Sequence, residues 1–176
     1  MNSLVRLFLA GLLVSLCGSS LATPPRTEFE QSFIGREWIP ECPDAAPYPL
    51  SYRCKYLGGY EIRRKQKEVD GFSIQYFTCN GRELDLFAQT VDGRKLKVID
   101  ALLLPRLKPG ERLMQPGECE LNGNNDTYFT ALVHLGRREK VDWKTGVRAA
   151  WIPTPETGKI EELSTRHVVC WRPTPP

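Results

Sequence analysis

The sequence predicts a mainly β domain with one short N-terminal helix, held together by disulfides. Asn-Gly and Asp-Gly pairs, which favour tight turns, separate runs of β-branched, aromatic or alternating residues in the middle of the chain. Near the C-terminus two further apolar runs flank a turn that contains Gly158. Cysteines recur along the chain, as in small exported domains. We therefore expect an antiparallel meander that a C-terminal hairpin unit closes into a sandwich or a partly open barrel.

The first 22 residues have the pattern of an export signal, and we expect cleavage after Ala22. Arg6 supplies the positive start, residues 7–16 are apolar, and small residues occupy the positions that a signal peptidase reads. The apolar run is too short to span a bilayer. Cys17 stands where a lipoprotein carries its acylated cysteine, but the large Leu16 before it departs from that signal. The pattern favours soluble export over a lipid anchor through Cys17.

Residues 23–51 and 52–176 form one globular domain after cleavage. The first range is a Pro-rich leader with a short helix and a loop, and the second range is rich in strands. Residues 38–49 contain four prolines, which exclude a regular helix or a central strand. We expect a loop there, pinned by Cys42.

The short helix is predicted from a capping box in the leader. Thr27 stands at the N-cap position and Glu30 follows three residues later. Phe29 and Phe33 would share one face of a helix of two turns, and Gly35 would end it.

Four strands are expected next, at residues 60–66, 72–79, 83–91 and 95–104. The pairs Asp70-Gly71, Asn80-Gly81 and Asp92-Gly93 stand between them, and a type I′ turn requires positive φ at both of its central positions. Four strands and three tight turns make the meander.

The remaining strands follow an irregular segment, residues 105–126, in which Leu113 and Met114 form a short edge strand. Further strands are expected at residues 128–135, about Val141, and at residues 147–152, 159–163 and 168–171. The last three make the closing hairpin unit.

Five of the 6 cysteines follow Ala22, so at most two bridges form within the mature chain and one thiol is left. The turning strands between Cys119 and Cys170 should bring these two together. Cys42 and Cys54 flank the Pro-rich loop and are the second expected pair, with Cys79 as a buried free thiol. Cys79 could instead replace either member of that second pair.

No zinc or nucleophile motif occurs in the sequence, and we expect neither a metal nor a cofactor. An envelope hydrolase is the alternative function, with a site assembled from His134 and His167 and a nearby carboxylate of Asp126 or Glu118. Residues 122–126 resemble a calcium loop in composition, but Asn and Gly clusters more often serve as turns.

Glu83 and Asp85 share one face of a predicted strand, so they are candidates for a pair of catalytic carboxylates of the glycosidase kind. They alternate with Leu84 and Leu86, as the solvent side of a half-buried strand does. We therefore expect Glu83 and Asp85 to face water.

A binding protein without catalytic activity is the favoured function, of the inhibitor or immunity type. Leu107, Leu113, Met114 and Trp143 are the expected contact residues, since a purely solvated segment does not need such apolar side chains. The alternative is that residues 105–126 fold over the open end of the sheet and cover core. Removal of residues 1–22, which contain one basic and no acidic residue, lowers the net charge from +3 to +2. This charge is too nearly balanced to argue for nucleic acid or an anionic membrane as partner. We expect the partner to be an envelope protein or another macromolecule.

The last third of the chain resembles a family of small exported proteins of Gram-negative bacteria to which no function has been assigned. The shared order is Cys119-Glu-Leu-Asn122-Gly123, Asp126, Ala131-Leu-Val133, Ala150-Trp151, Thr157-Gly158-Lys159 and Val169-Cys170. The resemblance implies a periplasmic location and carries over no catalytic residue.

Overall fold

The computed structural model describes residues 25–39, 52–64, 67–125 and 127–173, which form an antiparallel β protein that includes a half-barrel. The elements are α1 (Glu28–Gln31), β1 (Glu37–Trp38), β2 (Cys54–Arg64), β3 (Lys67–Cys79), β4 (Arg82–Thr90), β5 (Leu96–Leu103), β6 (Glu111–Met114), β7 (Cys119–Leu121), β8 (Thr130–His134), β9 (Lys140–Asp142), β10 (Val147–Thr154), β11 (Lys159–Glu162) and β12 (Val168–Trp171). The predicted fold class is confirmed.

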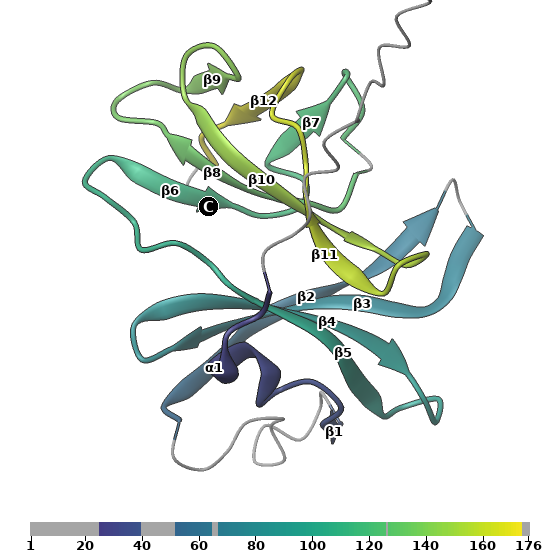
Figure 1. Cartoon of the computed structure of the whole chain (residues 1–176). Coiled ribbons are helices and arrows are strands. Elements are labelled where there is room, and N and C mark those ends of the chain that lie inside the picture. The colour runs from purple at the N-terminus through teal and green to yellow at the C-terminus, as the bar shows by residue number, and fades with distance from the viewer. Residues whose placement is uncertain (1–24, 40–51, 65–66, 126, 174–176) are drawn as a thin grey trace, which may run out of the picture.

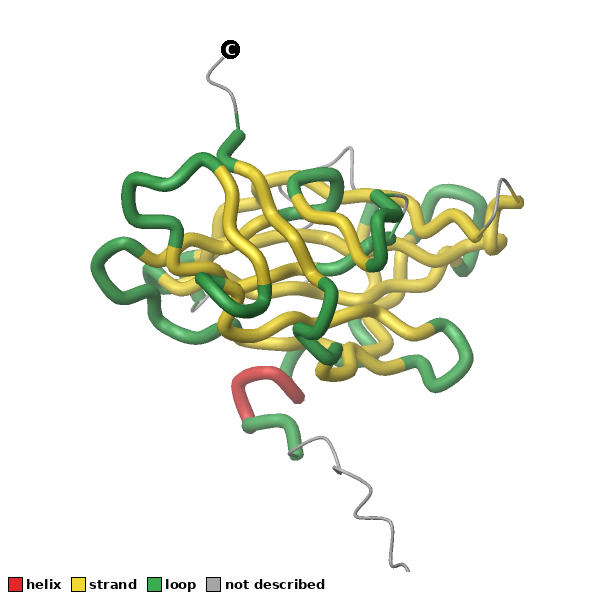
Figure 2. Tube along the Cα trace, turned by 90° about the horizontal axis from the view of Figure 1, so that it is seen from above, coloured by secondary structure: helices red, strands yellow, loops and turns green. Residues whose placement is uncertain are grey.

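The described strands form three sheets that lie one above another (Figure 1). The five-stranded sheet has the order β1-β5-β4-β3-β2, the four-stranded sheet β11-β10-β8-β6, and the three-stranded sheet β7-β12-β9. Viewed down the stack, the strands overlap and α1 lies at one side of them (Figure 2). The four-stranded sheet is therefore the middle layer, between the five-stranded sheet with α1 and the three-stranded sheet.

Strands of the middle sheet are buried on both faces. In β8, Ala131 and Val133 pack with residues of the three-stranded sheet, whereas Leu132 packs toward the five-stranded sheet. In β6, Met114 and Leu113 divide between the same two sides. A strand covered on both faces carries a continuous apolar run instead of an alternating one, which explains the sequence of β8.

Two of the three predicted turns join neighbouring strands, but only the one at Asn80 and Gly81 has the expected type I′ geometry, since Asp92 does not have a positive φ. Asn80 and Gly81 join β3 to β4 with φ angles of 52° and 75°, the positive values that a type I′ turn requires. Asp92 lies in the turn between β4 and β5, which a hydrogen bond of 2.8 Å from Val91 N to Lys95 O closes. These turns give the β3-β4-β5 part of the predicted meander.

The prediction of a turn at Asp70 and Gly71 is wrong, because both residues lie within β3 and the β2–β3 connection comes earlier in the chain. Gly71 has a φ of 86°, and a Cβ atom there would lie 3.3 Å from the Cβ of Thr90 on β4. Glycine at this position allows close packing of two strands with a left-handed backbone.

The capping box of α1 is confirmed. The Thr27 hydroxyl accepts the Glu30 N–H at 3.3 Å, and the Glu30 carboxylate accepts the Thr27 N–H at 2.7 Å. The helix has four residues and not the two turns predicted, because the next N–H groups bond to carbonyls three residues back and tighten the chain toward Gly35. Phe29 and Phe33 share one face, with ring centroids 5.1 Å apart.

Arg26, just ahead of the helix, ties the N-terminal segment to two sheets. Its guanidinium donates to both carboxylate oxygens of Asp100 on β5, at 3.0 and 2.6 Å, and to the carbonyl of Ile160 on β11 at 2.6 Å. The Asp100 carboxylate also accepts the Ile160 N–H at 2.7 Å. Further along, Glu30 accepts the N–H of Leu103 at 2.7 Å. The segment is therefore fixed by charge-assisted hydrogen bonds as well as by Phe29 and Phe33.

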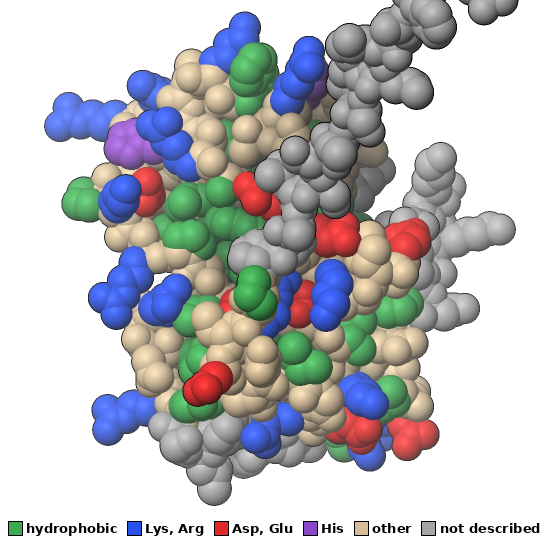
Figure 3. Space-filling view, viewed as in Figure 1, with side chains coloured by type: hydrophobic (Ala, Val, Ile, Leu, Met, Phe, Trp, Pro, Cys, Tyr) green, Lys and Arg blue, Asp and Glu red, His purple; other side chains and the backbone are tan. Residues whose placement is uncertain are grey.

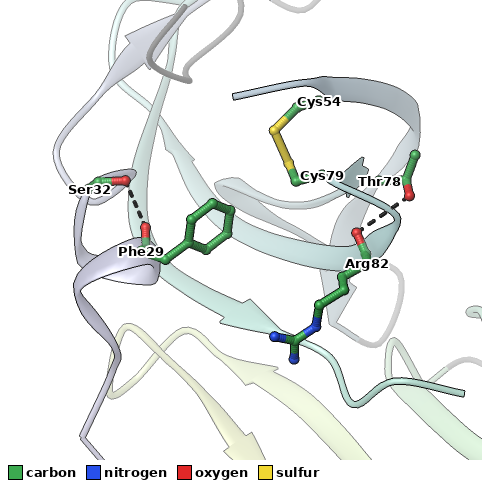
Figure 4. Close-up of a disulfide and its surroundings, with 6 residues drawn as sticks. All are labelled: Phe29, Ser32, Cys54, Thr78, Cys79 and Arg82. Atoms are coloured by element: carbon green, nitrogen blue, oxygen red, sulfur yellow. Dashed lines mark hydrogen bonds between the residues drawn. A yellow bond between two sulfur atoms is a disulfide. The ribbon is translucent and has the colours of Figure 1, made fainter. Parts of the chain in front are cut away.

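The described residues contain two disulfides, one of which was predicted correctly. Cys119 and Cys170 are bonded, and they stand opposite each other on β7 and β12. The expected bridge from Cys42 to Cys54, with Cys79 free, is wrong. Cys54 is bonded to Cys79, its direct partner in the β2–β3 register, at a Cα–Cα distance of 4.0 Å (Figure 4). Cys42 and the predicted signal lie outside the described residues.

The start of the predicted Pro-rich loop belongs to the sheet. Trp38 pairs with Leu96 at the edge of the five-stranded sheet and is buried against it. Most of the remaining loop, from residue 40 onward, lies outside the described residues. Within the described ranges no helix is both long and apolar enough to cross a membrane. The two disulfides indicate an oxidising, extracellular-type compartment.

Candidate functional site

Three turns meet at one end of the three-stranded sheet, at residues 122–124, 142–146 and 165–168, and we call this place the loop corner. The strand register brings them together, because Leu121 stands opposite Val168. Asn122 N donates to His167 O at 3.2 Å, and Trp143 N donates to Val168 O at 3.1 Å. The rings of Trp143 and His167 have centroids 6.4 Å apart.

Asn122 and Gly123 form a tight turn, as Asn and Gly clusters commonly do. Their φ angles are 54° and 76°, and Leu121 and Asn124 on either side exchange two backbone hydrogen bonds of 2.9 and 3.0 Å. Among the described residues no group of three or more His, Cys, Asp or Glu side chains could hold a metal ion. Asp126 lies outside the described residues.

His167 has an unusual backbone conformation for its residue type. It is the third residue of a turn closed by a 3.0 Å hydrogen bond from Val168 N to Thr165 O, and its φ is 67°. Glycine is the usual residue at such a position, and a side chain with a Cβ atom raises the free energy of the folded state there. The His167 side chain is exposed. A strained backbone at a residue with an exposed side chain is a feature that functional sites often show.

The turn that follows β9 presents Trp143 to solvent in a fixed orientation. The Asp142 carboxylate accepts the N–H groups of Lys144 and Thr145 at 3.0 and 2.9 Å and the Thr145 hydroxyl at 2.8 Å. The side-chain bond from Thr145, together with the backbone donors, lowers the pKa of Asp142, so the carboxylate stays ionised and keeps the turn closed. Trp143 is 40% exposed, with the Lys144 ammonium 5.1 Å from its ring centroid.

The structure divides the four predicted contact residues into two groups. Leu113 and Met114 form the predicted edge strand, but they are only 6% and 0% exposed, so their assignment to a contact surface is wrong. They belong to the core because the middle sheet is covered on both faces. Leu107 and Trp143 are 44% and 40% exposed, and their role in binding stays a prediction.

The two histidines of the hydrolase alternative have different neighbours. The His134 ring lies against Gly110, where a Cβ atom would stand 2.8 Å from the ring, whereas His167 lies beside Trp143. Figure 3 shows the histidine side chains as separate patches. Glu118, a carboxylate considered with them, accepts the N–H of Gln115 at 2.8 Å and so closes a different turn. The contacts of the described residues therefore do not assemble a catalytic group around them.

Asp85 is the buried carboxylate that sequence reasoning placed wrongly. It is 2% exposed, because its face of β4 packs against the middle sheet while Leu84 and Leu86 pack on the opposite face with α1. Its carboxylate accepts the Thr130 hydroxyl of β8 at 2.7 Å. Burial raises the pKa of Asp85 to about 7, although the Thr130 bond opposes this, and burial also raises the pKa of Glu83. Phe87 follows Asp85 by two residues on the same face of β4 and is buried, and this apolar residue is the signal that could have identified Asp85.

Comparisons with known proteins give the chain no relatives. No protein-family model matches it, and neither a curated protein nor a solved structure matches it significantly. The resemblance of the C-terminal third to exported proteins therefore stays a prediction. The function proposed below follows from the contacts and exposure of the chain's own residues.

Proposed function

We propose that this chain is an exported, periplasmic binding protein without catalytic activity, and that it contacts another macromolecule of the cell envelope through the loop corner. The observation that carries the proposal is Trp143, a large exposed aromatic side chain held by a rigid turn. Tryptophan is enriched among the few residues that supply most of the binding energy of an interface.

Rigidity supports the proposal as much as residue type does. The backbone of Trp143 bonds to Val168, and Asp142 fixes the next two residues. The Cys119–Cys170 bridge lies in the strands that carry the corner. A contact that is already ordered in the free protein loses less conformational entropy on binding, and that loss is about 0.5 to 1.5 kcal/mol for each side chain immobilised.

Cross-linking within cells tests the proposal and identifies the partner. A photoreactive amino acid is placed at Arg166, an exposed residue in the turn that contains His167, and in a matched strain at Tyr56, an exposed residue on β2 at the far edge of the five-stranded sheet. We expect a specific cross-linked protein or glycan from position 166 and none from position 56. The affinity of the purified partner is then measured for Trp143→Ala and for Tyr56→Ala.

The expected loss for Trp143→Ala is at least tenfold in Kd, which corresponds to about 1.4 kcal/mol, with an unchanged melting temperature. Tyr56→Ala should bind as the native protein does. Equal cross-linking from both positions, or equal affinities of both variants, would show that the loop corner is not the contact surface.

A further inference from the structure

Cationic side chains and tryptophans continue from the loop corner along the three-stranded sheet. Arg172 donates to the carbonyls of Gly136 and Arg138 at 2.7 and 3.2 Å, and Arg138 donates to the carbonyl of Thr145 at 2.7 Å. The ammonium of Lys140 lies 5.2 Å from the ring centroid of Trp171, its cross-strand partner. We call Arg138, Lys140, Lys144 and Arg172 the basic band.

The charge of the basic band is only partly balanced by its surroundings. All four cations are exposed, and none forms an ion pair with another described residue. Two carboxylates lie beside them on the chain, Asp142, which attracts Lys144 and is bonded within its turn, and the exposed Glu139, so four cations and two carboxylates leave a net charge of +2. In Figure 3, Lys and Arg side chains predominate at the end of this face where β9 and β12 lie, whereas most Asp and Glu side chains lie toward β11 and the five-stranded sheet.

The orientation of the arginines suits carboxylates. Backbone carbonyls hold Arg138 through Nη1 and Arg172 through Nε and Nη2, so Arg138 keeps its Nε and Nη2 donors and Arg172 keeps those of Nη1. The Nε and Nη2 donors of Arg138 can bind a carboxylate through two parallel hydrogen bonds, and Nη1 of Arg172 can donate single hydrogen bonds to a second carboxylate. Two tryptophans, Trp143 and Trp171, lie among these donors and offer apolar contact area. Alternating cations and aromatic rings are complementary to a segment in which acidic and apolar residues alternate.

We propose that the loop corner and the basic band together bind an acidic segment of a partner protein; the inference rests on the proposed function and adds the chemistry of the partner. A protein is favoured over a nucleic acid because the two disulfides belong to an oxidising compartment. Four separated cations also fall short of the continuous basic track by which proteins follow a phosphate backbone. Affinity for the acidic segment falls with salt, since exposed charges are screened within about 10 Å at 0.1 M ionic strength.

The test uses the full mature chain and a fluorescent synthetic peptide in which Glu and Asp alternate with Leu and Phe. Binding is measured by fluorescence anisotropy at about 50 mM and about 300 mM NaCl, a range over which surface charges become strongly screened. The comparison ligands are a peptide with Gln and Asn in place of the acids, a single-stranded DNA of equal length, and a sulfated glycan.

Two charge-reversal variants are matched in charge. Lys140→Glu with Lys144→Glu changes the basic band, and Arg94→Glu with Lys97→Glu changes exposed cations beside β5 by the same amount. We expect the acidic peptide to bind the native chain and the second variant equally, and to bind the first variant at least tenfold more weakly. The neutral peptide should not bind, and the affinity for the acidic peptide should fall at high salt.

Failure of this inference is distinguishable from failure of the proposed function. Suppose that Trp143→Ala weakens binding of the cross-linked partner while the charge reversal at Lys140 and Lys144 leaves it unchanged. In that case the loop corner is the contact surface, and the inference that the partner segment is acidic is wrong. If the DNA or the glycan binds more tightly than the acidic peptide, and the variant at Lys140 and Lys144 loses this binding, the partner is a polyanion and not an acidic protein segment. Absence of acidic-peptide binding at low salt also overturns the inference.

Discussion

The buried carboxylate of Asp85 makes the stability of the fold depend on pH. The folded protein raises its pKa from 3.8 to about 7, and the first cause is burial between two sheets. The folded state therefore holds this proton more tightly than the unfolded state does, so the contribution of Asp85 is most favourable below pH 4 and is lost as the pH rises to 7. Three pKa units correspond to roughly 4 kcal/mol of unfolding free energy.

Asp85→Asn should therefore stabilise the protein at pH 8 by about 2 to 4 kcal/mol, because the amide carries no charge and can still accept the Thr130 hydroxyl. At pH 4 the two proteins should differ by less than about 1 kcal/mol, since Asp85 is then protonated in the folded state. Urea denaturation at both pH values measures the difference. Asp92→Asn, in the exposed turn after β4, is the control and should change stability at neither pH. A gain that is the same at pH 4 and pH 8 would contradict the raised pKa.

The ion pair of Arg26 with Asp100 is one of the contacts that hold the N-terminal segment on the sheets. Arg26→Met removes the guanidinium from Asp100, whose carboxylate is 0% exposed and would retain only the Ile160 N–H as a donor. Breaking a buried pair in this way usually destabilises a protein by about 3 to 5 kcal/mol. Arg36→Met, which changes an exposed arginine bonded to the carbonyl of Ser32, should have an effect below about 0.5 kcal/mol.

Chemical denaturation measures the unfolding free energy of these two variants and of a double variant that combines Arg26→Met with Asp100→Asn. The double variant should recover part of the loss, because no uncompensated charge remains buried. A loss below about 1 kcal/mol for Arg26→Met would mean that water replaces the guanidinium at Asp100.

The bridge from Cys54 to Cys79 connects neighbouring strands, and its removal can be tested without affecting the loop corner directly. Non-reducing peptide mapping should give two linked pairs, Cys54 with Cys79 and Cys119 with Cys170. Replacing both Cys54 and Cys79 by Ala should lower stability by roughly 3 to 4 kcal/mol, the loop-closure value for a sequence separation of 25. A peptide that links Cys42 to Cys54 would contradict the structure.

Local sequence signals predicted most strands, the helix cap and a tight turn, but they predicted less well which strand segments pair with each other. Thr27 with Glu30, and Asn80 with Gly81, act within a few residues, so the cap and the tight turn could be read directly. Asp70-Gly71 carries the same signal, but the β2–β3 pairing continues to Arg64 and Lys67 and overrides it. Local propensity cannot show such a long-range choice.

The candidate site was predicted in parts and not as a whole. Trp143 was expected at the surface, and residues 122–126 were expected to form a turn. Their meeting with His167 depends on the register of β7, β12 and β9, which no local pattern specifies. Asp85 was misplaced because the alternation rule assumes one solvated face, and both faces of β4 are covered. Met114 was misplaced because its sequence does not show that β6 joins a sheet that is covered on both faces.

Across the whole molecule, the middle sheet makes the two ends of the chain interdependent. No disulfide among the described residues joins the five-stranded sheet to the other two sheets. The connection consists of buried apolar side chains, among them Phe87, Leu132 and Ile160, and of the hydrogen bonds of Asp85 and Asp100. Loss of either outer layer exposes a face of the middle sheet to water.

The described sheets should therefore unfold as one cooperative unit. Hydrogen–deuterium exchange should give the same slow opening free energy for the amides of β4, in the five-stranded sheet, and of β8, in the middle sheet. Amides of the turn at Asp92, which are exposed, serve as the fast reference. Much faster exchange in β8 than in β4 would indicate that the C-terminal sheets open independently.

Cys54 is opposite Cys79 on the β2–β3 hairpin, although Cys42 is the cysteine that precedes it along the chain. A chain oxidised in the order in which its thiols emerge would join Cys42 to Cys54 first, and thiol–disulfide exchange would then have to correct the pairing. Hairpins form in about 1 to 10 μs, whereas disulfides form over seconds or longer. Strand pairing can therefore bring Cys54 to Cys79 before either thiol reacts, so that oxidation follows the register of the hairpin and not the order of the cysteines.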